Sequence, residues 1–214
     1  MASPGAGAMY RVMSSRVDLV ALHAREYGAG RTPRVVATAP ARYLSLDGAG
    51  DVSGGEFLEQ ALALQRLLRD LRSRVRREAG KDFALPPLEA LVGEPRGSAS
   101  GAADGAVNGP WKLLLRIPAF VRVSDLVALA DEVEGEWEAW RPARIEELRE
   151  GRCIQALHVG PSGSVASTVD RLRRTAAEQD LAVRGRLHEV WLSDPGRTPA
   201  ERRRTVVRLS VRPR

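Results

Sequence analysis

The sequence predicts an α+β fold: two tandem strand–helix–strand–strand units form one curved antiparallel sheet, with the helices on one face and a ligand cleft on the other. Two distant stretches, Leu88–Pro95 and His188–Pro195, share one pattern, a short apolar run that contains a carboxylate and closes on an acid and a proline. Each stretch follows an amphipathic helix, and each helix follows a strand and a glycine-containing turn. The repeated order indicates an internal duplication about a pseudo-two-fold axis.

The first repeat is expected over residues 33–118. An apolar stripe from Phe57 to Val75 recurs every three or four residues and predicts a long helix whose core-facing side it forms. The capping-box sequence Ser53–Glu56 precedes this helix, and Gly80 ends it. Residues 95–110 are rich in Gly, Ala and Ser, have almost no apolar side chains to bury, and are expected to form a flexible loop. The other expected elements are a strand over Arg34–Leu46 interrupted at Pro40, a turn over Asp47–Gly50, and strands over Phe83–Val92 and Trp111–Pro118.

The second repeat is expected over residues 143–214, after a linking helix over residues 123–141. Ser164 is a candidate N-cap for the helix of this repeat. Residues 1–32 show no clear periodicity and are expected to be irregular. The remaining expected elements are strands over Arg152–Val159, Arg186–Leu192 and Arg204–Val211, and a short helical turn after the capping box Thr198–Glu201.

Composition excludes several function classes. The 214 residues suffice for one large domain or two small ones, and the single cysteine, Cys153, rules out an internal disulfide. Three scattered histidines and one cysteine do not give metal-ligand spacing, so neither a metal nor a cofactor is expected. The net charge of +6 comes without a DNA- or RNA-binding motif, so nucleic acid is not the expected partner. With no signal-peptide pattern and no long apolar run, we expect a cytoplasmic protein.

Glu189 is the first candidate site residue. Strand alternation places Leu187, Glu189 and Trp191 on one face of the sheet, which we assign to the cleft. A carboxylate among aromatic rings has two uses: it pairs with a flat cation, or desolvation raises its pKa and makes it a general base for water. The alternative is a solvated acid on an exposed sheet face.

Further ligand-binding candidates come from large flat side chains and from polar residues near the same strands. Trp111 and Trp191 are carried by strands and are candidates for stacking a ligand, whereas Trp137 falls on a helical stripe, where core packing is the usual role. A structural or solvated role is the alternative for Glu89, and a turn role for His158. The candidates are Trp111, Trp191, Tyr43, Glu89, Trp137 and His158.

Five segments resemble the GyrI-like small-molecule-binding family, in order and with similar spacing, from about residue 16 to the C-terminus. The most specific is the His-Glu-x-aromatic-Leu-Ser-Asp-Pro stretch. One departure is that Leu91-Val92 stands where stand-alone relatives often have two tryptophans. The segments are Arg16–Leu19, Tyr43–Asp51, Pro86–Leu91, Cys153–Pro161 and His188–Pro195.

The resemblance implies the duplicated fold and a site between the repeats for bulky, flat, often cationic molecules. Related domains are effector-binding modules of multidrug-sensing regulators, and some stand-alone members hydrolyse the cyclopropane of spirocyclopropyl DNA-alkylating antibiotics. By the same resemblance, the acid of the cleft corresponds to Glu189.

Three functions remain open from the sequence. The first is a hydrolase that captures an aromatic, drug-like molecule and opens its cyclopropane with water. The second is a drug sequesterer or sensor without catalysis, in which Glu189 is only a counter-charge. The third is a modulator of a DNA-handling enzyme that acts through the basic residues Arg202–Arg204. A homodimer is compatible with all three.

Overall fold

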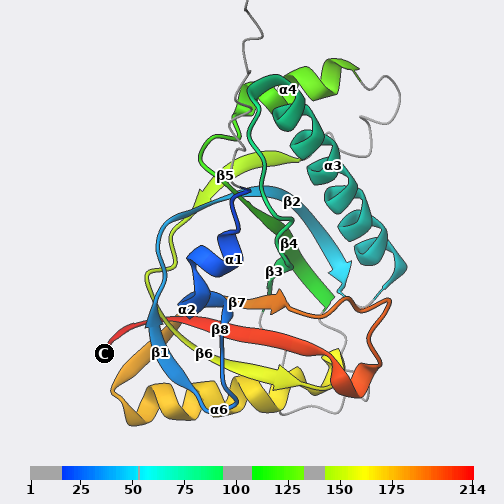
Figure 1. Cartoon of the computed structure of the whole chain (residues 1–214). Coiled ribbons are helices and arrows are strands. Elements are labelled where there is room, and N and C mark those ends of the chain that lie inside the picture. Colours follow the sequence, from blue (N-terminus) through cyan, green and yellow to red (C-terminus); the bar gives the residue numbers. More distant parts are fainter. Residues whose placement is uncertain (1–15, 53, 94–107, 133–142) are drawn as a thin grey trace, which may run out of the picture.

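A computed structural model describes residues 16–52, 54–93, 108–132 and 143–214. Its centre is one antiparallel sheet of eight strands in the order β1-β6-β8-β7-β3-β4-β2-β5 (Figure 1). The strands are β1 Arg34–Ala37, β2 Ala41–Asp51, β3 Leu88–Val92, β4 Asn108–Ile117, β5 Arg144–Leu148, β6 Arg152–Val159, β7 Leu181–Trp191 and β8 Arg204–Pro213. The predicted α+β fold with a single antiparallel sheet is therefore confirmed.

The sheet contains the predicted repeat twice. The units β2–α3–β3–β4 and β6–α6–β7–β8 meet where β3 pairs with β7. The two edge strands are exchanged: β1 precedes the first unit but pairs with β6 of the second, and β5 precedes the second unit but pairs with β2 of the first. This exchange ties the units into one sheet and preserves the pseudo-two-fold relation.

Two long helices cover one face of the sheet. Helix α3, Gly55–Ala79, packs over β2 and β4, and α6, Val165–Glu178, packs over β6, β7 and β8. The α3 stripe predicted from Phe57 to Val75 is buried, and Gly80 ends the helix at a φ of 63°. The residue before α3 is Gly54, which has no side chain to cap it, and Ser53 of the predicted capping box lies outside the described residues.

The predicted interruption at Pro40 is confirmed: β1 ends at Ala37 and β2 begins at Ala41, and the two strands join distant parts of the sheet. One prediction near β2 is wrong. The predicted turn Asp47–Gly50 lies inside β2 and pairs with Lys112–Gly109 of β4. Residues 108–110 of the predicted loop also form strand, because β2 supplies their hydrogen-bonding partners. The rest of that loop lies outside the described residues.

The face away from the long helices is covered by a segment that was predicted to be irregular. It forms α1, Leu19–Leu22, and α2, Ala24–Tyr27, and Asp18 caps α1 by accepting from the amides of Val20 and Ala21. Tyr27 packs against Val190 and Val206 of the central strands. Each of these helices has only four residues, which is too short for a helical periodicity to be detected in the sequence.

The predicted linking helix begins as α4, Val123–Glu132, and its remainder, with Trp137, lies outside the described residues. Two short 3-10 helices complete the structure, Ser162–Ser164 and Ala200–Arg202. The predicted cap at Thr198–Glu201 is wrong: Pro199 precedes the second of these turns and no side chain caps it. Within the described ranges, no helix is long and apolar enough to cross a membrane.

Candidate functional site

Glu189 and Trp191 lie on the face of the sheet that carries the two long helices. Glu189 pairs with Ala90 of β3 and Val207 of β8, both of which belong to the core beneath the helices. The prediction that these side chains share a face is confirmed, but their assignment to the face away from the helices is wrong. Alternation fixes which residues share a face; the crossover helices decide which face that is.

The Glu189 carboxylate is held by a neighbouring indole. Trp191 Nε1 donates to Glu189 Oε2 at 3.1 Å, and both residues are half-buried. Burial raises the pKa of Glu189 above its ordinary value. The hydrogen bond from Trp191 and the positive charge of the neighbouring residue, His188, lower this pKa, but their effects are smaller than that of burial. The carboxylate therefore sits in a poorly solvated position beside an aromatic ring, where its basicity is increased.

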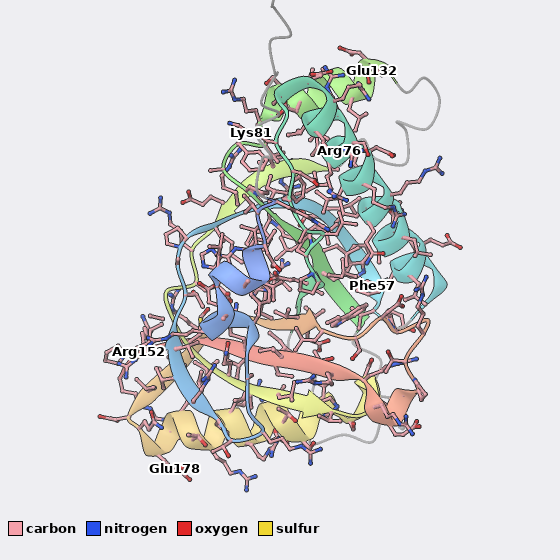
Figure 2. The ribbon with its side chains drawn as sticks, viewed as in Figure 1. Phe57, Arg76, Lys81, Glu132, Arg152 and Glu178 are labelled. Atoms are coloured by element: carbon pink, nitrogen blue, oxygen red, sulfur yellow. The ribbon has the colours of Figure 1, made fainter. Side chains whose placement is uncertain are left out.

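Phe57 connects Trp191 to Trp111 and forms an aromatic cluster at one side of Glu189. The ring centroids of Phe57 and Trp191 are 5.6 Å apart, and those of Phe57 and Trp111 are 5.1 Å apart at 87°. Phe57 comes from the N-terminal end of α3 (Figure 2). Sequence analysis assigned it only to the helix core, because a helical stripe does not show which sheet residues it meets.

Trp111 supports this cluster from within the core. Its side chain is 2% exposed, so it does not present a free stacking surface as predicted. Its ring lies over Gly48 of β2: a Cβ at Gly48 would stand 2.1 Å from two of its ring carbons. Gly48 thus provides the space that Trp111 occupies beneath Phe57.

Gly48→Ala is expected to displace this indole. The added methyl overlaps a buried ring, so we expect the free energy of unfolding to fall by about 2 kcal/mol, as in overpacked cores. Urea unfolding monitored by tryptophan fluorescence measures it. Gly109→Ala is the matched control, because Gly109 lies on the neighbouring strand with open space at its Cβ position. Equal stability of the two variants would contradict the role given to Gly48.

Glu89 and Tyr43 lie on the opposite face of the sheet, so their predicted place beside Glu189 is wrong. Glu89 pairs with Val190 and therefore points away from the long helices. Its carboxylate accepts from Tyr27 Oη at 2.7 Å and from Tyr43 Oη at 3.2 Å. All three side chains are buried, and they belong to a polar network that fastens α2 to the sheet.

His188 is at the centre of this network. Its Nε2 lies 2.9 Å from Glu89 Oε2, and its Nδ1 lies 2.9 Å from Glu150 Oε2. Arg208 Nη1 donates to the same Glu150 oxygen at 3.1 Å, and its Nη2 donates to the carbonyl of Glu26 at 2.7 Å. Of these residues only Glu89 was a candidate from the sequence, and the network itself was not predicted, since its members come from distant segments of the chain.

A second ion pair completes the charge balance of the network. Arg116 Nη1 donates to Glu26 Oε2 at 2.7 Å, with both side chains nearly fully buried. The three carboxylates of Glu26, Glu89 and Glu150 thus face Arg116, Arg208 and His188. Because His188 is the third cation, the network is balanced only while its imidazole is protonated.

Stability is expected to depend on pH through this imidazole. Although burial opposes the charge, Glu150 and Glu89 raise the pKa of His188 from 6.5 to about 9. A raised folded-state pKa gives stability that is complete below pH 6.5 and is lost as pH rises through 9. At about 1.4 kcal/mol for each tenfold change in proton affinity, the loss is of the order of 3 kcal/mol.

The measurement is the free energy of urea unfolding from pH 6 to pH 10, in wild type and His188→Gln. The variant should be less stable near neutrality and show a flatter profile through this window. The same slope in both proteins would contradict the assignment.

Glu150 determines how stability depends on pH on the acid side. Although burial opposes its charge, His188 and Arg208 lower the pKa of Glu150 from 4.5 to about 2. The stability that Glu150 contributes is therefore complete above pH 4.5 and is lost as pH falls through 2.

His158 lies on the helix face but is used within the fold. Its Nδ1 is 3.0 Å from Thr168 Oγ1, and its Nε2 is 3.2 Å from both the carbonyl of Pro161 and Ser164 Oγ. Ser164 also donates to Pro161, so it does not cap α6 as predicted. His158 therefore fixes the start of α6 and is not free to contact a ligand beside Glu189, contrary to the prediction.

Within the described ranges, no group of histidine, cysteine and acidic side chains is arranged to hold a metal ion. Cys153 is buried, and burial raises the pKa of its thiol to about 11. Among the predicted site residues, Glu189 and Trp191 lie together on the helix face, and both are partly exposed.

Neither a protein-family model nor a curated protein matches the sequence. Solved structures share the fold. An uncharacterized conserved protein from Listeria innocua is 24% identical, with a TM-score of 0.78 over 92% of this chain and 100% of that chain. A hydrolase from Listeria innocua is 23% identical, with the same TM-score and coverage. The C-terminal domain of EcmrR is 10% identical, with a TM-score of 0.54 over 86% of this chain and 98% of that domain.

Proposed function

We propose that the helix face at the junction of the two repeats binds a flat, aromatic small molecule and hydrolyses it. The observation that carries the proposal is a half-buried carboxylate, Glu189, whose pKa is raised by burial and whose position is fixed by the indole of Trp191. The fold shared with a Listeria innocua protein described as a hydrolase, and the resemblance to the GyrI-like family, support the reaction class.

The proposed reaction is the opening of an activated cyclopropane by water. The Glu189 carboxylate accepts a proton from water while the water oxygen forms a bond to a ring carbon. The ring C–C bond breaks, and its electron pair passes into the conjugated carbonyl system of the ligand, which then takes up a proton. A strained electrophile of this kind requires a positioned base and little else, so one carboxylate suffices.

Trp191 has two roles in this proposal. Its N–H keeps the Glu189 carboxylate in one orientation, and its ring offers a surface to the flat ligand. Phe57 supports that ring from α3. The increased basicity of Glu189 is the property a general base needs near neutral pH, and it comes from the poor solvation of the carboxylate.

The test is incubation of the purified protein with a spirocyclopropyl DNA-alkylating antibiotic, followed by mass spectrometry. A product heavier than the ligand by one water, formed faster than in buffer alone, is expected. Ligand binding without that product would overturn the hydrolase and leave a sequestering protein. Neither binding nor product would overturn the whole proposal for this ligand class.

A further inference from the structure

A hollow of about 480 Å³ lies at the edge of the sheet where α6 begins. It is lined by the end of β6, by α6 and by Arg31 of the segment before β1. The lining includes Leu157 and Val159 on the β6 side. Figure 1 shows α6 at the end of the sheet that contains β6, with β3 and β4 farther away, and α6 packs over β6, β7 and β8.

The lining is strongly cationic. It contains Arg31, Arg171 and Arg174 and no acidic residue. Arg31 and Arg174 are exposed and form no hydrogen bond or ion pair within the described ranges, whereas Arg171 Nη2 donates to Thr168 Oγ1 at 3.2 Å. Three guanidinium groups around one hollow repel one another unless an anion lies between them.

Ser164, which precedes α6, and Ser167 and Thr168 of α6 line the same hollow together with the arginines. The hydroxyls of Ser164 and Ser167 already donate to the carbonyls of Pro161 and Ser164, so the guanidinium groups are the donors offered to a ligand. Ser167, Arg171 and Arg174 recur at the spacing of one helix face, so their side chains converge. The start of α6 has no side-chain cap, because the Ser164 hydroxyl is directed to Pro161 and His158, and the helix dipole adds positive potential there.

We propose that this hollow binds a phosphate group, either free phosphate or the phosphomonoester of a small molecule. Three guanidinium groups match the charge of a dianion better than that of a single carboxylate, and each fork fits two tetrahedral oxygens. The volume exceeds that of phosphate itself and leaves room for an organic part against Leu157 and Val159. Since none of its lining residues is part of the Glu189 cluster, this site does not depend on the proposed hydrolase.

The experiment is calorimetric titration of the full chain with inorganic phosphate and with phenyl phosphate, at constant ionic strength in chloride. Saturable binding of either is expected. Phenyl phosphate binding more tightly than phosphate identifies a phosphomonoester, and equal affinities identify free phosphate. Heats that never saturate, or that chloride reproduces, would overturn the site.

The variant Arg31→Gln/Arg174→Gln removes two exposed, unpaired cations, so folding is expected to be preserved. It should lower the affinity for phosphate at least about tenfold. Arg69→Gln/Arg76→Gln removes the same charge from exposed positions of α3 and should bind as wild type does. An equal loss of phosphate affinity in both variants would show that the effect depends only on net charge, and it would overturn the proposal. Unchanged binding in Glu189→Gln is expected, and this separates the two sites.

Discussion

Glu189→Gln is expected to abolish turnover of a cyclopropane-containing ligand while the ligand is still captured. The amide keeps the size of the side chain and an oxygen that accepts from Trp191 Nε1, so the local structure is preserved. It cannot accept a proton from water. Since general-base catalysis typically contributes a factor of 10²–10⁴, the rate should fall at least about 100-fold.

The measurement is the rate of appearance of the hydrated product by mass spectrometry, together with the dissociation constant of the intact ligand. Glu178→Gln is the matched control, because it makes the same substitution at an exposed position at the end of α6 (Figure 2). Unchanged turnover in Glu189→Gln would exclude Glu189 as the base. Loss of affinity for cationic ligands alone, with no product in either protein, would favour the sequestering function.

Arg208→Met is expected to cause the largest loss of stability. The Arg208 guanidinium bonds to Glu150, Gln155 and the carbonyl of Glu26, and it is 2% exposed. Its removal leaves buried acceptors unpaired and the three carboxylates facing only Arg116 and His188. Breaking such a buried pair typically costs about 3–5 kcal/mol, a large part of the stability of a domain.

Urea unfolding of Arg208→Met and of Arg144→Met tests this expectation. Arg144 also pairs with acidic groups, Asp47 and Glu146, but its side chain is 46% exposed. Because solvent screens exposed pairs, its loss should cost less than about 1 kcal/mol. Similar losses in the two variants would show that the buried network contributes no more than a surface ion pair. Should Arg208→Met fail to fold, Arg208→Lys provides an intermediate case.

The network also explains why α1 and α2 cover the sheet. Tyr27 and Glu26 each bond to a group that is buried in the sheet, Glu89 and Arg116 respectively. Without that segment, these polar groups would line an open face. The face that the sequence favoured for a ligand is thus covered by α1 and α2, and Glu189 lies on the other face, beneath the long helices.

The duplication could be predicted from the sequence, but not its alignment. The two motifs align Glu89 with Glu189, yet these acids lie on opposite faces of the sheet. Rotation about a two-fold axis normal to the sheet leaves every side chain on the same face. The residue of the first repeat that corresponds to Glu189 must therefore also face the helices. Ala90, directly opposite Glu189, does so. The shared acid is therefore a coincidence of composition and carries no common role.

Local patterns determined the elements that depend on neighbouring residues. The α3 stripe, its end at Gly80 and the common face of Leu187, Glu189 and Trp191 follow from helix and strand periods alone. The sequence also directed attention to Glu189, because a carboxylate in an apolar strand is conspicuous wherever the strand lies.

Only the tertiary structure decided which face those side chains occupy and what they meet there. Pairing register and the crossover helices place Phe57 beside Trp191, bring Glu89, Glu150 and Arg208 around His188, and separate β1 from β2. These contacts join residues far apart in the chain, and their free energy depends on burial, which exists only once the sheet has formed. A period of two or of 3.6 residues carries no information about that environment.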